Sequence, residues 1–204
     1  GGGVMRWFES EFAGEERIRE KDVQKSSLVQ LNDIAGKVEP GCDGLVFLPY
    51  MSGERTPVWD VKAKGVFYGI DFSKTKGHFV RACMEGVAYS LRHNLEVAQK
   101  AGAESDVLRA VGGSANSRLW TQIKADVTGR RIIVPASDTA TTMGAAMLAG
   151  RAVGMYASYE EAVALAVKDT RTHEPDAGVR AAYDRAYETY LSLYEDLKGL
   201  MQRT

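Results

Sequence analysis

The sequence predicts a mixed α/β fold, because short apolar runs that end in turn-forming residues alternate with segments of helical periodicity. Two such runs are residues 45–49 and 107–111, which proline and glycine close before they reach helical length. The last segment shows the opposite pattern, since apolar residues recur at spacings of four and three from Tyr183 to Met201. With 204 residues, 45% of them hydrophobic, the chain can bury a sizeable core. We therefore expect one domain over residues 1–204.

In chain order, the first half combines helices with two strands. We expect a glycine-led helix at 4–12, a charged segment at 14–27, a helix at 28–34, a turn at 41–44, a strand at 45–49, a loop at 51–64, a strand at 66–70 and a long helix at 78–98. On the long helix, Ala82 and Gly86 lie four residues apart on one face. Such a small-residue face can approach a neighbouring backbone closely.

The second half continues the alternation. We expect a strand at 107–111 with a helix after it, a strand at 131–134 that Pro135 ends, a small-residue helix at 142–153, a capping box at 158–161 before a helix at 162–167, and the final helix. The tyrosines of that final helix follow a buried stripe, so we interpret them as core residues rather than as a ligand cage.

Composition excludes several functional classes. The formal net charge of −1 gives no reason to expect nucleic acid or an anionic membrane as a partner. No apolar run approaches the roughly 20 residues that cross a bilayer. Cys42 and Cys83 are too few for a disulfide scaffold and lack metal-binding spacing, which favours the reducing cytoplasm. We expect no signal peptide, and Gly1–Gly3 reads as a chain entered midway.

The segment from Val107 to Ser117 indicates a phosphate site. Gly112 and Gly113 let the backbone approach a ligand, and Asn116 or Ser117 would cap the helix that follows. The first free N–H groups of such a helix attract an anion. A glycine pair alone fits a simple strand-to-helix turn better than a phosphate site, so other segments must decide between the two interpretations.

Several motifs in the same order resemble those of the FGGY carbohydrate kinases. The run from Gly65 to Ile70, followed after seven residues by His78 to Glu85, is similar to a family signature, with Cys83 as a mild departure. Residues 47–57 resemble a loop of the xylulokinase-like members. Residues 112–126 resemble the adenosine motif, and residues 143–149 resemble a helix near the adenine pocket. The resemblance covers essentially the whole chain.

The resemblance implies the C-terminal domain of an actin-like, ribonuclease H-like ATPase fold, in which two domains close over ATP, with Mg²⁺, and a sugar. It also implies that the N-terminal domain and the strand bearing the catalytic aspartate lie outside this chain, so no residue here is assigned as the general base. By chemistry alone Glu54, Asp60, Asp126 and Asp138 are candidates, and each fits a solvated carboxylate better.

The resemblance also implies the nucleotide contacts. Gly112, Gly113 and Ser114 would lie along phosphate and ribose, and Ser117 stands where glycerol kinases have an asparagine, with Asn116 as the alternative. Gly2 and Arg6 fall where relatives have residues near the ATP phosphates, unless the glycines are a remnant of an expression vector. Thr139 stands where many relatives have a glutamate. No protein metal ligand is expected.

We therefore expect the chain to be the ATP-binding part of a cytoplasmic sugar kinase. D-Xylulose is the leading substrate because of the loop containing Gly53 to Pro57, while gluconate, ribulose and other polyols remain open. The alternative is a free-standing, non-catalytic nucleotide-binding or interaction module of the same fold. Exposed apolar area and a sheet edge would make the isolated chain self-associate, with a homodimer as the expected form.

Overall fold

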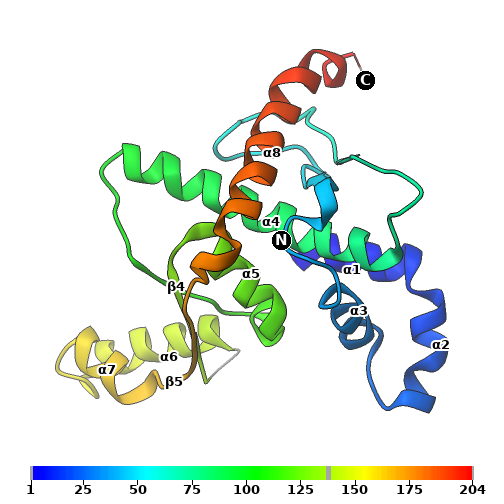
Figure 1. The fold of residues 1–204 in the computed structure, drawn as a ribbon. Coiled ribbons are helices and arrows are strands. Elements are labelled where there is room, and N and C mark those ends of the chain that lie inside the picture. The colour runs from blue at the N-terminus through cyan, green and yellow to red at the C-terminus, as the bar shows by residue number, and fades with distance from the viewer. Residues whose placement is uncertain (1, 137–138, 204) are drawn as a thin grey trace.

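The computed structural model describes residues 2–136 and 139–203 (Figure 1). Its helices are α1 (Gly2–Phe12), α2 (Gly14–Val23), α3 (Ser27–Ala35), α4 (Lys76–Lys100), α5 (Arg118–Thr128), α6 (Ala140–Ala152), α7 (Tyr159–Ala166) and α8 (Arg180–Met201). Three short 3₁₀ helices are η1 (Cys42–Gly44), η2 (Gly113–Asn116) and η3 (Ala177–Val179). In Figure 1, α1–α3 lie toward the lower right and α6 and α7 toward the lower left, while α8 rises away from both groups.

The strands form two small sheets. In the first, β1 (Val46–Leu48) pairs antiparallel with β2 (Val66–Tyr68). In the second, β3 (Val107–Arg109) runs parallel to β4 (Arg131–Pro135), which pairs antiparallel with β5 (Asp169–His173). The parallel pair is joined through η2 and α5, as parallel strands require a crossover connection. The predicted α/β class is therefore correct.

The core is centred on α4, which contacts α1, α3, α5, α8 and β1. The expected small-residue face is confirmed, because the backbone carbonyl of Phe47 in β1 lies where a Cβ on Gly86 would be. Ala82 is also fully buried on this helix. The absence of a side chain at Gly86 lets the helix and the strand approach closely.

A buried polar cluster joins α4 to α8. Arg81 Nε donates to Glu85 Oε1 at 2.7 Å, and Arg81 Nη2 donates to the Tyr183 hydroxyl at 2.8 Å. Glu85 also accepts from the Gly41 backbone N–H at 3.1 Å and from the Tyr89 hydroxyl at 3.2 Å. These partners offset the cost of burying the charges.

The tyrosine stripe of α8 is structural, as predicted. Tyr183, Tyr187 and Tyr190 are buried against α4 and β1, and the hydroxyls of Tyr50 and Tyr190 are 2.7 Å apart. Tyr194 donates to Asp60 Oδ2 at 2.9 Å and so pins the loop that follows β1.

Two elements differ from the expectation. The charged segment after α1 forms α2, whose lysine, arginine and glutamate residues have good intrinsic helix propensity. β5 consists of polar residues without an apolar alternation, so only its pairing with β4 marks it as a strand. Pro135 belongs to β4, although the register shifts there.

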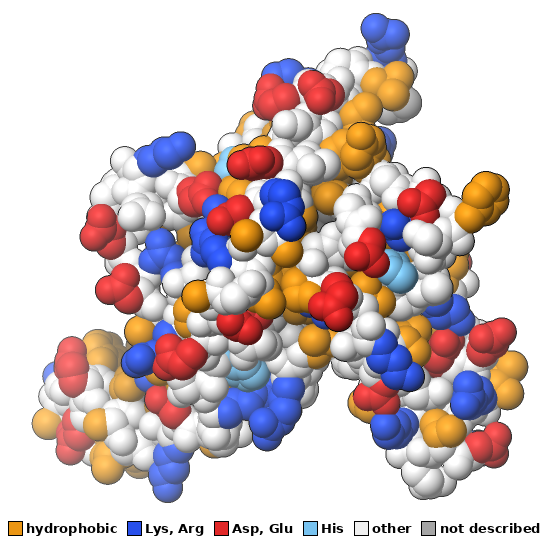
Figure 2. Space-filling model, in the orientation of Figure 1, with side chains coloured by type: hydrophobic (Ala, Val, Ile, Leu, Met, Phe, Trp, Pro, Cys, Tyr) orange, Lys and Arg blue, Asp and Glu red, His pale blue; other side chains and the backbone are white. Residues whose placement is uncertain are grey.

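The surface charges and the helices agree with the expectations drawn from composition. Acidic and basic side chains are interspersed over the face shown in Figure 2. Among the described residues, none of the helices combines the length and apolarity needed to cross a bilayer.

Candidate functional site

The glycine-rich connection leads from β3 into α5. Gly112 has φ +81°, a left-handed conformation that favours glycine. Gly113 has no such constraint, and a Cβ placed there would meet no atom of the described residues within 4 Å. The backbone of Gly113 therefore faces open space, and it does so at the start of η2.

Ser117 is the cap of α5. Its Oγ accepts the Trp120 backbone N–H at 3.0 Å, so of the two proposed capping residues it is Ser117 that caps. The same hydroxyl donates to Asn32 Oδ1 at 2.9 Å. Asn116 is exposed and has no hydrogen bond through its side chain within the described parts of the chain. Its amide is thus available to a ligand, whereas most of the hydrogen-bonding capacity of Ser117 is used.

A cavity of about 660 Å³ opens at this connection. The structure brings together there all but one of the binding residues expected from the sequence: Gly2, Arg6, Gly113, Ser114, Asn116 and Ser117. Gly112 instead lines a neighbouring cavity of about 290 Å³, which shares Asn116 with the first and extends to Pro135, Ala136 and Arg171. The two cavities together surround the η2 turn.

Three helices begin at the larger cavity. Gly2 starts α1, Ser26 caps α3 through a 3.4 Å hydrogen bond from the Val29 N–H, and Ser117 caps α5. The first N–H groups of a helix carry a partial positive charge, so the capped starts of α3 and α5 direct positive potential toward one space. Arg6 is exposed and adds a full charge, and none of the described lining residues is acidic. This arrangement suits a polyanion.

Sequence reasoning missed the contribution of α3 and α4 to this cavity. Ser26, Leu28, Val29 and Asn32 enter from α3, and Met84 enters from α4. The serine pair before Leu28 is a local signal in the sequence that indicates a helix N-terminus at this position. The proximity of Asn32 to Ser117 could not, because 85 residues separate them and only tertiary packing joins them.

The candidate carboxylates do not reach the cavity. Asp60 accepts the Lys62 N–H at 2.8 Å, which is the main reason that its pKa is lowered. Glu54 accepts the Arg55 N–H at 2.8 Å. Asp126 accepts from Gln122 Nε2 at 2.7 Å and from a backbone N–H at 2.8 Å, while burial raises its pKa. These groups stabilise loops and α5, and Asp138 lies outside the described residues.

The small-residue helix also lies apart from the larger cavity. Neither Thr139 nor Gly144 to Ala146 lines it, because α6 packs mainly on α7 and is largely exposed. Among the described residues, the lining of the smaller cavity includes Ala136, which precedes this helix in the sequence.

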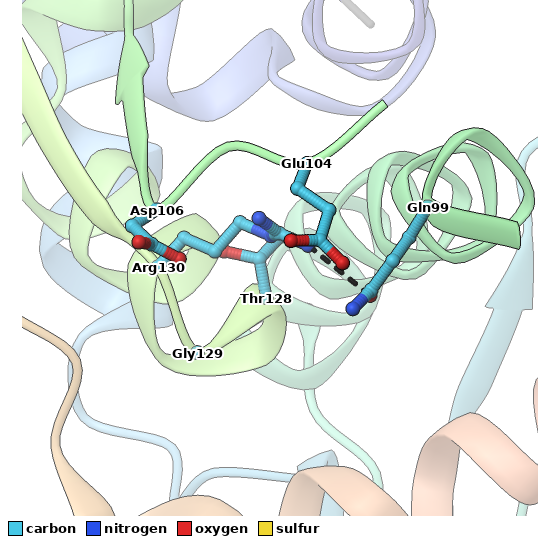
Figure 3. Close-up of a pocket in the computed structure, with 6 residues that line it drawn as sticks. All are labelled: Gln99, Glu104, Asp106, Thr128, Gly129 and Arg130. Carbon is cyan, nitrogen blue, oxygen red and sulfur yellow. Dashed lines mark hydrogen bonds between the residues drawn. The ribbon is translucent and has the colours of Figure 1, made fainter. Parts of the chain in front are cut away.

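A further pocket lies at the opposite end of α5. It measures about 280 Å³ and is lined by Gln99, Glu104, Asp106, Thr128, Gly129 and Arg130. Figure 3 shows the Arg130 side chain extended across it toward Gln99, to which Nη2 donates at 3.5 Å. Since 11 residues of helix separate the two ends, roughly 16 Å of α5 lie between this pocket and the glycine loop.

Comparison with known proteins identifies close relatives. Residues 1–153 match the profile of the FGGY family of carbohydrate kinases, C-terminal domain. The chain is 32% identical to the xylulose kinase of Staphylococcus epidermidis over 183 residues, which cover 90% of this chain and 37% of that protein. It is 34% identical to the gluconokinase of Bacillus licheniformis over 201 residues, covering 98% of this chain and 39% of that protein.

A solved structure shows the same fold. The crystal structure of xylulose kinase from Rhodospirillum rubrum matches with a TM-score of 0.82 at 32% identity, over 98% of this chain and 39% of that one. This match confirms the expected actin-like, ribonuclease H-like fold, of which the chain represents a C-terminal part. The chain spans between 37% and 39% of the length of these relatives.

Proposed function

Because the chain belongs to the FGGY family of carbohydrate kinases, we propose that residues 1–204 form one domain, the C-terminal, nucleotide-binding domain of an ATP-dependent sugar kinase. The observation that carries this proposal is the meeting of three helix starts and the Gly113 backbone at one cavity. Phosphoryl transfer depends on positioning the γ-phosphoryl group and on stabilising its charge. A cavity at which helix starts meet, and whose described lining contains no acidic residue, supports both.

This proposal assigns a role to each of the binding residues expected from the sequence. Gly112, Gly113 and Ser114 lie along phosphate and ribose, where a side chain on either glycine would occupy the ligand's space. Gly2 and Arg6 approach the phosphates from α1. Asn116 offers its free amide toward the base, while Ser117 holds α5 in place.

Magnesium accompanies ATP in phosphoryl transfer and neutralises phosphate charge. The described lining of the cavity contains no carboxylate, and no cluster of metal-binding side chains occurs among the described residues. Such a lining does not fit a protein-held ion. We therefore assign Mg²⁺ to the phosphate oxygens and not to side chains of this chain.

The sugar and the general base would come from outside this chain. We propose a missing N-terminal domain as the partner that binds the sugar, because the relatives are much longer than this chain. D-Xylulose is the proposed substrate, in line with the xylulose kinase relatives, and gluconate is its nearest competitor.

We propose the cytoplasm as location, since both cysteines are free and buried. We also propose a homodimer, since Trp59, Val61 and Phe72 are largely exposed.

Nucleotide titration tests the proposal. We expect isothermal calorimetry to show ADP and ATP binding to the wild-type chain, and Gly113→Val to abolish it by filling the cavity. Gly14→Val is the matched control, because Gly14 also has open space around its Cβ position but starts α2 away from the cavity. Equal affinity in wild type and folded Gly113→Val would contradict the proposal. Nucleotide binding by this chain, together with the lack of any sugar-binding domain that acts with it, would favour the alternative, a free-standing, non-catalytic nucleotide-binding module.

A further inference from the structure

Lys124 places a positive charge directly behind the wall of the larger cavity. Its Nζ donates to Ser114 Oγ at 3.2 Å and lies 4.5 Å from the centre of the Trp120 ring. Ser114 and Trp120 both line the cavity. Trp120 is itself fixed, because its indole N–H donates to the Met84 carbonyl at 2.9 Å. The ammonium group is therefore held at the glycine loop.

No carboxylate neutralises this ammonium group among the described residues. Several charged or titratable groups on the elements packed against α5 have other partners: Arg81 with Glu85 in α4, Arg92 with Asp184 of α8, Arg131 of β4 with Glu174, Arg171 of β5 with the Ala115 carbonyl, and His173 of β5 with Gln122. On α5, Asp126 receives hydrogen bonds from Gln122 and the Asp176 N–H.

Burial without a counter-charge has a measurable consequence. Desolvation lowers the pKa of Lys124 to about 8. Lys76 offers a contrast, because its ammonium group pairs with Glu16 at 3.0 Å. Burying this charge lowers the stability of the folded chain, and only the Ser114 hydroxyl separates the ammonium group from the cavity. An anionic ligand in the cavity would therefore interact favourably with Lys124.

We propose that Lys124 recognises the polyphosphate of the bound nucleotide, contributing its charge across Ser114 to phosphate groups on the Gly112–Ser114 loop. The inference rests on the proposed function and adds a charged residue to a site otherwise built from backbone N–H groups and Arg6. The strength of the interaction should grow with the number of phosphates, and adenosine should not experience it.

The experiment compares adenosine, AMP and ADP by calorimetry on the 204-residue chain at pH 7. We expect Lys124→Met to weaken ADP binding about tenfold or more, AMP binding less, and adenosine binding not at all. Lys124→Arg should retain most of the ADP affinity. Lys198→Met is the matched control, since Lys198 is exposed on α8 and pairs with Glu195, and it should change none of the three affinities.

A pH series gives a second readout. In the wild type, ADP affinity should fall as pH rises above about 8, because the free chain then loses the Lys124 proton. In Lys124→Met this fall should disappear. Circular dichroism confirms that each variant is folded, and Lys124→Gln serves as a second neutral variant.

The outcomes separate the two claims. A wild-type chain that binds no ADP at any pH overturns the proposed function and this inference with it. ADP binding that Lys124→Met leaves unchanged, or that it weakens by the same factor as adenosine binding, overturns the inference alone.

Discussion

The Ser117 hydroxyl donates a hydrogen bond to Asn32 Oδ1 at 2.9 Å and accepts one from the Trp120 N–H at 3.0 Å. One side chain thus caps α5 and ties it to α3. Since both helices begin at the same cavity, this link fixes the spacing of two of the three helix starts. A residue that resembles a ligand contact in the sequence is, in the fold, a structural support of the site.

Replacing Ser117 by alanine should therefore lower stability. Ser117→Ala removes the cap of α5 and leaves the Asn32 amide oxygen without its donor, so we expect a loss of about 1–2 kcal/mol in the free energy of unfolding. Urea denaturation measures it. Ser192→Ala on the exposed surface of α8 is the control and should change stability little.

Replacing the neighbouring residue, Asn116, should affect ligand binding and not stability. Asn116→Ala should leave the urea midpoint unchanged, because the side chain is exposed and makes no hydrogen bond to the described residues, but it should weaken ADP binding. A loss of stability at Asn116 together with unaltered ADP affinity would contradict the division of tasks proposed for these two residues.

Two glycines in long helices should respond to alanine with opposite sign. At Gly86 an added methyl group would collide with the Phe47 carbonyl, and we expect Gly86→Ala to destabilise the protein by about 1–3 kcal/mol. At Gly199 no atom of the described residues lies within 4 Å of the added Cβ, so Gly199→Ala should stabilise by roughly 0.5–1 kcal/mol through helix propensity. Thermal and urea denaturation of both variants provides the comparison, and destabilisation at both positions would refute the packing argument.

These glycines also show what the sequence could predict. The spacing of Ala82 and Gly86 indicated a close backbone approach, and proline and glycine marked the ends of β1 and β3, because such signals are local. β5 gave no local signal, since its strand state depends on hydrogen bonds to β4. The contributions of Asn32 and Lys124 to the cavity region were equally hidden. They depend on how α3 and η2 pack on α5.

The low pKa of Lys124 predicts a pH-dependent difference in stability between the wild type and Lys124→Met. Below about pH 8 the lysine is charged in both the folded and unfolded chain, so the cost of burying the charge is fully present. As pH rises from about 8 toward 10.5, the folded chain loses the proton that the unfolded chain keeps, and this contribution to stability improves. We therefore expect Lys124→Met to be more stable than the wild type at pH 7, with a gap that narrows above pH 8.

Urea midpoints of both proteins between pH 6 and 10 measure this gap. Comparing the two proteins at each pH cancels the titration of other groups, including Tyr50, whose pKa burial raises to about 12. A gap that is constant across this range would show that Lys124 is charged to the same extent in both states.

Residues 1–204 alone should bind nucleotide without consuming it in response to sugar. General-base catalysis needs a carboxylate near the attacking hydroxyl, and none of the described residues lining the larger cavity is acidic. Among the candidates, Asp60 and Asp126 are engaged in loop and helix contacts. A coupled assay with ATP, Mg²⁺ and either D-xylulose or gluconate should give the same ADP release as the sugar-free control. Sugar-dependent release that Asp60→Asn or Asp126→Asn abolishes would place the base within this chain and refute the two-domain interpretation.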